Sequence, residues 1–175
     1  LGVITKIVLK LIPAVSHNVL LLVPFYKASQ ACEAVSAIFR AGIVPSALEF
    51  MERDAIDWSL RFIDGLNIQI KDEVQAHLLI EVDGNYPDIL FQEAEKITSV
   101  LDQYEIDEIL FADTDDQKNA LWKMRRNVAE AVKSNSIYKE EDTVVPRYEL
   151  PKLLEGIKTI GKKYGFQSVC YGHAG

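Results

Sequence analysis

The sequence has few cysteines and no long apolar run, and each shortage excludes a class of protein. Its 175 residues include two cysteines, Cys32 and Cys170, which are too few for a secreted disulfide scaffold. We expect two reduced thiols that pack as small hydrophobic side chains, in an intracellular, cytoplasmic protein. The longest apolar run, residues 19–23, is far below the roughly 18 to 20 residues that a membrane span requires. No transmembrane helix is therefore expected.

Basic residues are also fewer than acidic ones, which argues against nucleic acid as a partner. The chain has 19 Lys and Arg against 26 Asp and Glu, a formal net charge of −7, and no stretch that combines lysines with aromatic residues. A phosphate-binding glycine loop, Cys-x-x-Cys, His-Glu-x-x-His and a nucleophile elbow are all missing. The common enzyme motifs therefore give no assignment.

What the sequence does contain is a regular alternation of strand and helix patterns. Hydrophobic periodicity predicts strands over 18–25, 46–53, 76–84 and 106–112. Between them, one helix runs from Ala28 to a C-terminal glycine, and a second carries a proline in its first turn. This order is typical of an α+β, ferredoxin-like fold, in which two helices pack on one face of an antiparallel sheet.

The second half of the chain adds further helix–strand units to this plan. A Thr-x-x-Gln capping box predicts a helix over about 115–133, and short strands are expected at 143–145 and 167–173. A last helix begins at Pro151. Its inward-facing residues are expected to be Leu153, Ile157, Ile160 and Tyr164.

The N-terminal residues 1–13 form a β-rich segment that we set apart from the rest. Apolar residues alternate there with Thr5, Lys6 and Lys10, and the pattern ends at Pro13. It is read as a terminal strand or a lead-in. Because the first residue is not a methionine and no signal peptide is visible, we expect the chain to begin inside a longer protein. Residues 14–175 are treated as one domain.

Two residues are candidates for chemistry. His173 lies between glycines at the exit of the last strand, where a ligand or metal could approach the imidazole, although a histidine in a turn is the plainer alternative. Arg125 follows Trp122 by three residues on the same helix, which suits carboxylate recognition, although a solvated surface arginine has the same pattern. His77 and His17 are expected to be partly exposed structural residues. The residues alone indicate a soluble α+β domain with a candidate anion site.

Several segments together carry a family resemblance across nearly the whole chain. They are, in chain order, LGVIT (1–5), PSALEFM (45–51), LWKMR (121–125), EDTVVP (141–146) and GHAG (172–175). In this order and spacing they resemble the C-terminal, substrate-side domain of FAD-linked oxidases of the vanillyl-alcohol oxidase superfamily. The branch is that of the glycolate oxidase subunit, D-lactate dehydrogenase and D-2-hydroxyglutarate dehydrogenase.

The resemblance implies specific roles for residues of this chain. Residues 1–13 would be the last strand of an upstream FAD-binding domain, with Gly2, Val3 and Ile4 beside the flavin, and 14–175 would be the cap domain. Arg125 would bind the substrate carboxylate. His173 would be a catalytic residue and the first ligand of a divalent metal such as zinc, the other ligands following in the family's Asp-Gly-Asn-x-His continuation. Glu140 stands where the hydroxyglutarate branch has a substrate-binding lysine, so specificity for a second carboxylate stays open.

The resulting expectation is part of a flavin-dependent oxidoreductase that oxidises a 2-hydroxy acid of the glycolate or D-lactate type. FAD would be held mainly by the upstream domain, and the isolated piece would be inactive. An electron-acceptor protein or quinone, a homodimer, and a peripheral place at the inner face of the membrane are all compatible with this expectation. The alternative from another class is a stand-alone ferredoxin-like module that binds a small regulatory molecule.

Overall fold

The computed structural model describes residues 2–65 and 68–175, and it confirms the α+β class. Leu1, the first residue of the predicted N-terminal strand, lies outside the described residues. The elements are β1 (His17–Phe25), α1 (Ala28–Arg40), β2 (Ala47–Glu52), α2 (Arg53–Phe62), β3 (Ala76–Gly84), α3 (Pro87–Leu101), β4 (Leu110–Ala112), α4 (Asp115–Arg126), α5 (Val128–Asn135), the 3-10 turn η1 (Arg147–Glu149), α6 (Leu150–Tyr164) and β5 (Tyr171–His173).

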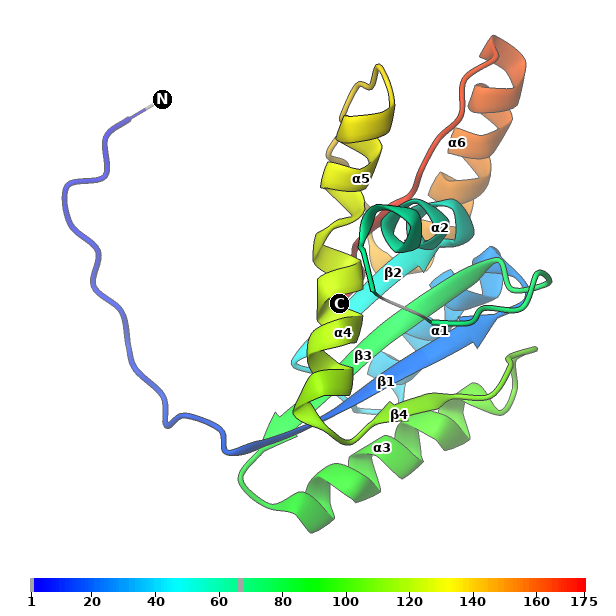
Figure 1. Ribbon diagram of the computed structural model, residues 1–175. Coiled ribbons are helices and arrows are strands. Elements are labelled where there is room, and N and C mark those ends of the chain that lie inside the picture. The colour runs from blue at the N-terminus through cyan, green and yellow to red at the C-terminus, as the bar shows by residue number, and fades with distance from the viewer. Residues whose placement is uncertain (1, 66–67) are drawn as a thin grey trace.

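The five strands form one antiparallel sheet in the order β4-β1-β3-β2-β5 (Figure 1). The first four strands have the ferredoxin-like order that the sequence predicted, and β5 extends the sheet beside β2. Its pairing places His173 directly opposite Glu49. Two residues that are 124 positions apart in the chain therefore become cross-strand neighbours.

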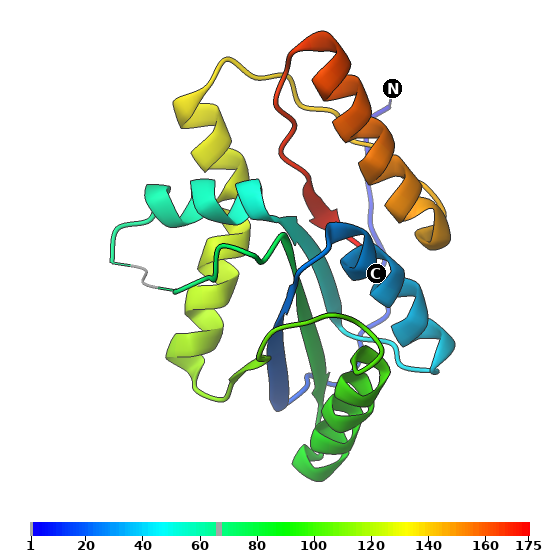
Figure 2. The ribbon, with the colours of Figure 1, turned by 90° about the vertical axis from the view of Figure 1, so that its right-hand side faces the viewer.

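Helices cover both faces of this sheet (Figure 2). As predicted, α1 and α3 pack on one face, where the larger apolar cluster lies, and α6 packs against α1. The opposite face is covered by α2, α4 and α5, a layer that the sequence reading did not anticipate. Its physical cause is in the strands: residues 20–23 of β1 and 78–80 of β3 are all buried, so both faces are apolar and each needs a cover.

The helix predicted over 115–133 is two helices that meet at Asn127. Thr114 caps the first by accepting a hydrogen bond from the backbone of Gln117, whose side chain returns the bond, so the predicted capping box is confirmed. The side chain of Asn127 bonds to the carbonyl of Lys123 and competes with the continuation of the helix. The predicted strand at 143–145 is absent from the described structure, where Val144 is 95% exposed.

Two further expectations need correction. In α6 the buried positions are Leu154 and Gly161, whereas Ile160 and Tyr164 are exposed, because this helix packs mainly on α1. The strand predicted to begin at residue 167 begins at Tyr171.

The N-terminal segment leads into β1 without pairing to the domain. Residues 2–13 are exposed and have no regular secondary structure, and the ribbon runs away from the sheet in Figure 1. A strand is stable only beside a partner strand. Of the two predicted forms, a terminal strand or a lead-in, the described part of the segment is therefore the lead-in.

The two cysteines are free thiols, as expected. Burial raises the pKa of Cys32 to about 12 and that of Cys170 to about 11, which keeps both protonated and unreactive. Among the described residues, no helix combines the length and the apolar character that crossing a bilayer requires.

Candidate functional site

The candidate site is built under α4, which crosses the sheet and aims three polar side chains at it. Lys118, Trp122 and Arg125 are spaced by four and three residues and so share one side of the helix. The neighbouring Leu121 and Met124 are buried in the apolar cluster and hold the helix in place. Lys118 contacts β1, Trp122 contacts β3 and Arg125 contacts β2, which is the order of these strands in the sheet.

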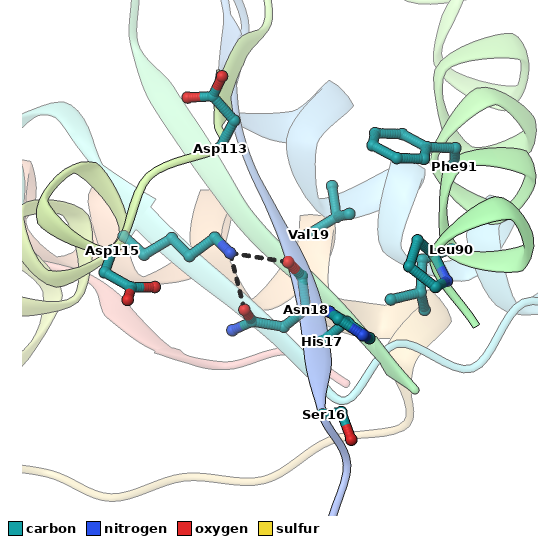
Figure 3. Close-up of a pocket in the computed structure, with 10 residues that line it drawn as sticks. Ser16, His17, Asn18, Val19, Leu90, Phe91, Asp113 and Asp115 are labelled. Carbon is teal, nitrogen blue, oxygen red and sulfur yellow. Dashed lines mark hydrogen bonds between the residues drawn. The ribbon is translucent and has the colours of Figure 1, made fainter. Parts of the chain in front are cut away.

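The first two contacts form a polar network on the sheet. Lys118 donates to the backbone carbonyl and the side-chain oxygen of Asn18 at 2.8 and 2.9 Å, the dashed lines in Figure 3. Asn18 in turn donates to Glu81 at 3.1 Å, and the other oxygen of Glu81 accepts the indole N–H of Trp122 at 2.7 Å. The Trp122 ring is therefore fixed in orientation, and the Arg126 guanidinium lies over it, 5.2 Å from the ring centroid.

The third contact is an Arg–Glu–His cluster at the end of β2. Glu49 is 4% exposed, and its Oε2 accepts a hydrogen bond from Nε of Arg125 at 2.8 Å and forms an ion pair with Nη2 at 2.7 Å. Its Oε1 lies 2.6 Å from Nδ1 of His173. The structure brings Arg125 and His173, the two candidate residues of the sequence, onto this one carboxylate.

The cluster leaves donors and an acceptor available for a ligand. Nη1 of Arg125 and one hydrogen of Nη2 are not used by Glu49, so the guanidinium can still bind a second carboxylate. Nδ1 of His173 contacts Glu49, which leaves Nε2 as the free nitrogen of the ring. The guanidinium also lies over the ring of Tyr171, 5.2 Å from its centroid, and this contact fixes its plane.

Beside the cluster is an open hollow of about 360 Å³. Its lining comes from the start of β2, from α4 and from the chain end, and consists of Pro45, Ser46, Ala47, Leu48, Glu49, Trp122, His173 and Gly175. The His173 side chain is 86% exposed, whereas the Arg125 side chain is 13% exposed and lies behind Glu49. The imidazole thus lines the hollow, and the guanidinium is joined to it through Glu49, which also lines the hollow.

A second hollow, of about 270 Å³, lies where β1 begins and is drawn in Figure 3. Two carboxylates, Asp113 and Asp115, and the exposed ring of Phe91 line it, and its lysine is already bonded to Asn18. We assign no chemistry to it.

The remaining candidates lie elsewhere. Gly2, Val3 and Ile4, predicted to contact the flavin, are in the exposed lead-in. His17 is exposed at the start of β1. His77 was expected to be partly exposed but is 2% exposed, with an unpartnered Nδ1, because both faces of β3 are covered. The pKa of His77 is lowered to about 3, first by burial and then by nearby Arg53, while Asp107 opposes the shift.

The predicted metal was tested against the donor groups at the site. Glu49 and His173 are both metal-binding residue types, but Oε1 of Glu49 and Nδ1 of His173 contact each other, which leaves Nε2 as the one free nitrogen of the imidazole. Within residues 2–65 and 68–175, no group of three or more His, Cys, Asp or Glu side chains could hold an ion. A catalytic metal usually takes three protein ligands, so the described residues do not fit a metal site by themselves.

The most central residue of the site, Glu49, was quoted in a motif but given no role from the sequence. A signal for it existed, because a carboxylate stands among Leu48, Phe50 and Met51 in an apolar strand. Glu81 carries the same signal in β3. Buried charges need partners, so such residues point to a polar network inside the fold.

Comparison with known proteins decides the family. The family model of FAD linked oxidases, C-terminal domain, matches residues 14–175. The chain belongs to this family. FAD is therefore the cofactor with which it is associated, and the resemblance inferred from the sequence motifs is confirmed.

Relatives with assigned names agree with this family. The chain is 30% identical over its full length to D-lactate dehydrogenase of Anaerostipes hadrus, and 30% identical to the glycolate oxidase subunit GlcD of both Bacillus subtilis (strain 168) and Escherichia coli (strain K12). It spans 38%, 37% and 34% of these three relatives, respectively. The FAD-linked oxidase domain therefore corresponds to little more than a third of each.

Proposed function

We propose that this chain is the substrate-side part of a flavin-dependent oxidoreductase that oxidises a small 2-hydroxy acid, of the glycolate or D-lactate type. The observation that carries the proposal is the Arg125–Glu49–His173 cluster beside the hollow. A 2-hydroxy acid needs a group that binds its carboxylate and a group that takes the proton of its hydroxyl. The cluster offers one of each, joined through a common carboxylate.

In this proposal Arg125 binds the substrate carboxylate through the edge that Glu49 leaves free. Its position is fixed by Glu49 on one side and by the Tyr171 ring on its face. A guanidinium held in this way recognises a planar carboxylate with two parallel hydrogen bonds, which a lysine cannot reproduce. The bound acid then has its C2 hydroxyl directed toward the imidazole.

His173 is proposed to take the hydroxyl proton on Nε2. The C2 hydrogen leaves as a hydride, and FAD, when bound, supplies the acceptor for it. The acid thereby loses two electrons and two hydrogens and becomes a 2-keto acid. The charge that Nε2 gains on protonation is balanced by Glu49 on the far side of the ring. No step in this scheme depends on a metal.

Residues 1–13 are proposed to join an FAD-binding domain, with Gly2, Val3 and Ile4 next to the flavin. Residues 2–13 are exposed and do not pair within residues 2–65 and 68–175, which leaves their backbone free for such a partner. The described residues include neither a glycine-rich phosphate-binding loop nor a hollow that encloses a dinucleotide. This supports FAD being held mainly by that second domain.

The walls of the hollow favour a small acid with one carboxylate. Trp122, Pro45 and Leu48 give it apolar sides, and the fixed indole leaves little freedom to widen it. Glu49 lines the hollow, and its carboxylate would repel a second carboxylate on the substrate.

The test is steady-state turnover of the protein made from the complete reading frame that encodes these residues, with an artificial electron acceptor. We expect kcat/KM for glycolate or D-lactate to exceed that for 2-hydroxyglutarate by at least about tenfold, since an unpaired buried carboxylate costs more than 1.4 kcal/mol. Trp122→Ala should raise the relative kcat/KM for a branched 2-hydroxy acid. Turnover of none of these acids would overturn the proposal and favour the regulatory module.

A further inference from the structure

We infer that Glu49 is a positioning residue that fixes the Arg125 and His173 side chains relative to each other, and that it selects Nε2 of His173 as the reactive nitrogen. The inference rests on the proposed function for its catalytic meaning, but its geometric content can be measured without any substrate. It starts from how the two oxygens of one buried carboxylate are divided.

Oε2 of Glu49 accepts a hydrogen bond from Nε of Arg125 at 2.8 Å and forms an ion pair with Nη2 at 2.7 Å, whereas Oε1 contacts His173 at 2.6 Å. With Oε2 held by a guanidinium that is itself packed on Tyr171, the carboxylate plane cannot turn freely. Oε1 is thereby aimed at the position that His173 occupies on the neighbouring strand. Arg125 on α4 thus fixes the orientation of the Glu49 carboxylate, and the carboxylate fixes the orientation of His173 at the end of β5.

The contact determines which ring nitrogen carries the hydrogen. A carboxylate at 2.6 Å accepts a hydrogen bond, so Nδ1 must be the donor and the neutral ring has its lone pair on Nε2. With the His173 side chain 86% exposed, this is the contact that fixes its direction. Without Glu49, the imidazole would lose both its orientation and its preferred tautomer.

Stability alone does not account for Glu49. Its neighbours Leu48 and Phe50 are apolar, and a buried ion pair contributes little net stability compared with well-packed apolar side chains. A residue that costs desolvation and contributes little to stability, but that joins two candidate functional groups, fits a positioning role.

The same strand offers a matched control in Glu52. It is buried as well, at 8% exposure, and bridges the Lys158 ammonium and the backbone N–H of Cys170, the latter at 2.8 Å. It lies three residues further along β2 and therefore on the opposite face of the strand, where Lys158 of α6 reaches it. Glu52 therefore shares the burial, the charge and the strand of Glu49 but touches neither Arg125 nor His173.

The experiment uses ¹⁵N-histidine labelling of the protein, in which His173→Gln assigns the His173 signals. Two-bond ¹H–¹⁵N spectra at a pH where the ring is neutral report which nitrogen is protonated. We expect Nδ1–H in the wild-type protein and in Glu52→Gln, and a change to the usual Nε2–H form in Glu49→Gln. Nε2–H in the wild-type protein would overturn the inference, and this reading needs no variant to fold.

Kinetics on the same proteins provide the second measurement. Loss of an orienting partner typically costs 10- to 100-fold, so we expect kcat for a 2-hydroxy acid to fall by about that factor in Glu49→Gln, and to stay within about twofold in Glu52→Gln. Equal kcat values for the two variants would overturn the positioning role. If the tautomer result holds but no 2-hydroxy acid is oxidised, then the proposed function fails and the geometric inference stands.

Discussion

The two faces of the sheet differ in what they contain, although the same strands form both. The face under α1, α3 and α6 carries the larger apolar cluster, which includes Leu78 and Ile80. The face under α2 and α4 has a smaller apolar cluster and also carries Glu49, Glu81 and the buried His77. One face stabilises the fold and thereby allows the other to hold polar groups whose burial is costly.

Strand β2 shows the difference within a few residues. Glu49 faces α4 and connects two candidate functional groups, whereas Glu52 faces α6 and ties that helix to the sheet. A carboxylate is therefore not a sign of function by itself. What distinguishes the two is whether the partners can still bind something else.

The largest expected effect is a loss of activity when the site on the face under α2 and α4 is altered. His173→Ala should lower kcat of the complete protein by about 10²- to 10⁴-fold, because it removes the proposed proton acceptor. The melting temperature should stay unchanged, since the His173 side chain is 86% exposed. A wild-type kcat in this variant would contradict the assignment of His173 as the proton acceptor.

The next effect is on stability and comes from the opposite face. Leu78→Ala should lower the free energy of unfolding by about 2 to 5 kcal/mol, because the side chain is fully buried between β3 and α1 or α3. Denaturant unfolding measures this, with the exposed Val144→Ala as a control that should stay within about 0.5 kcal/mol. A loss of activity in folded Leu78→Ala would show that the two faces are coupled.

The buried His77 should make the stability depend on pH. Its pKa is about 3 in the folded chain, lowered first by burial, against 6.5 in the unfolded chain. Below pH 6.5 the unfolded state takes up a proton that the folded state refuses, so stability is lost as the pH falls toward 3, by about 1.4 kcal/mol per pH unit.

Unfolding of the wild-type chain and of His77→Leu, followed from pH 7 to pH 4.5, isolates this contribution. The difference between the two should change with pH at that slope. If the difference in the free energy of unfolding is constant over this range, then the pKa of His77 is not lowered in the folded chain.

A smaller effect is expected when the planar donor group of Arg125 is lost. Arg125→Lys should lower kcat/KM by about ten- to one-hundred-fold, which corresponds to the roughly 1.5 to 3 kcal/mol of a charge-assisted hydrogen bond. The exposed Arg61→Lys, on α2 of the same face, is the control and should keep the wild-type value. If both variants behave alike, then Arg125 is not a substrate ligand.

The smallest effect concerns the helix that carries the site. Thr114→Ala removes the cap of α4 and should cost about 1 kcal/mol of stability, while Thr114→Ser should retain most of it. Thermal unfolding of the two variants gives the comparison. Equal melting temperatures would mean that α4 is held by its packing alone.

Much of the fold could be predicted from local patterns. The boundaries of β3, the proline in the first turn of α3 and the cap of α4 each depend on residues close in the sequence. Helix α2 was missed because it begins at Arg53, directly after β2 and without a turn residue between them. The apolar run 18–25 predicts a buried strand, but the helix cover that each of its two faces needs was not inferred from it.

The site was predictable only in part, for a different reason. Arg125 and His173 stand in recognisable motifs, but the link between them is a cross-strand neighbour of His173 that lies 124 residues earlier. Strand register is a tertiary property and cannot be read from local sequence. Glu49 therefore appears as the centre of the site only once the pairing of β2 with β5 is known.

The most direct test of the proposed function is anaerobic reduction of the flavin in the complete protein. D-lactate and glycolate are mixed with the oxidised protein in separate samples, and the visible absorbance of the flavin is followed. We predict that at least one of them bleaches the flavin within a single turnover and yields the 2-keto acid in equal amount. A flavin that stays oxidised with every 2-hydroxy acid, yet is reduced by dithionite, would contradict the account.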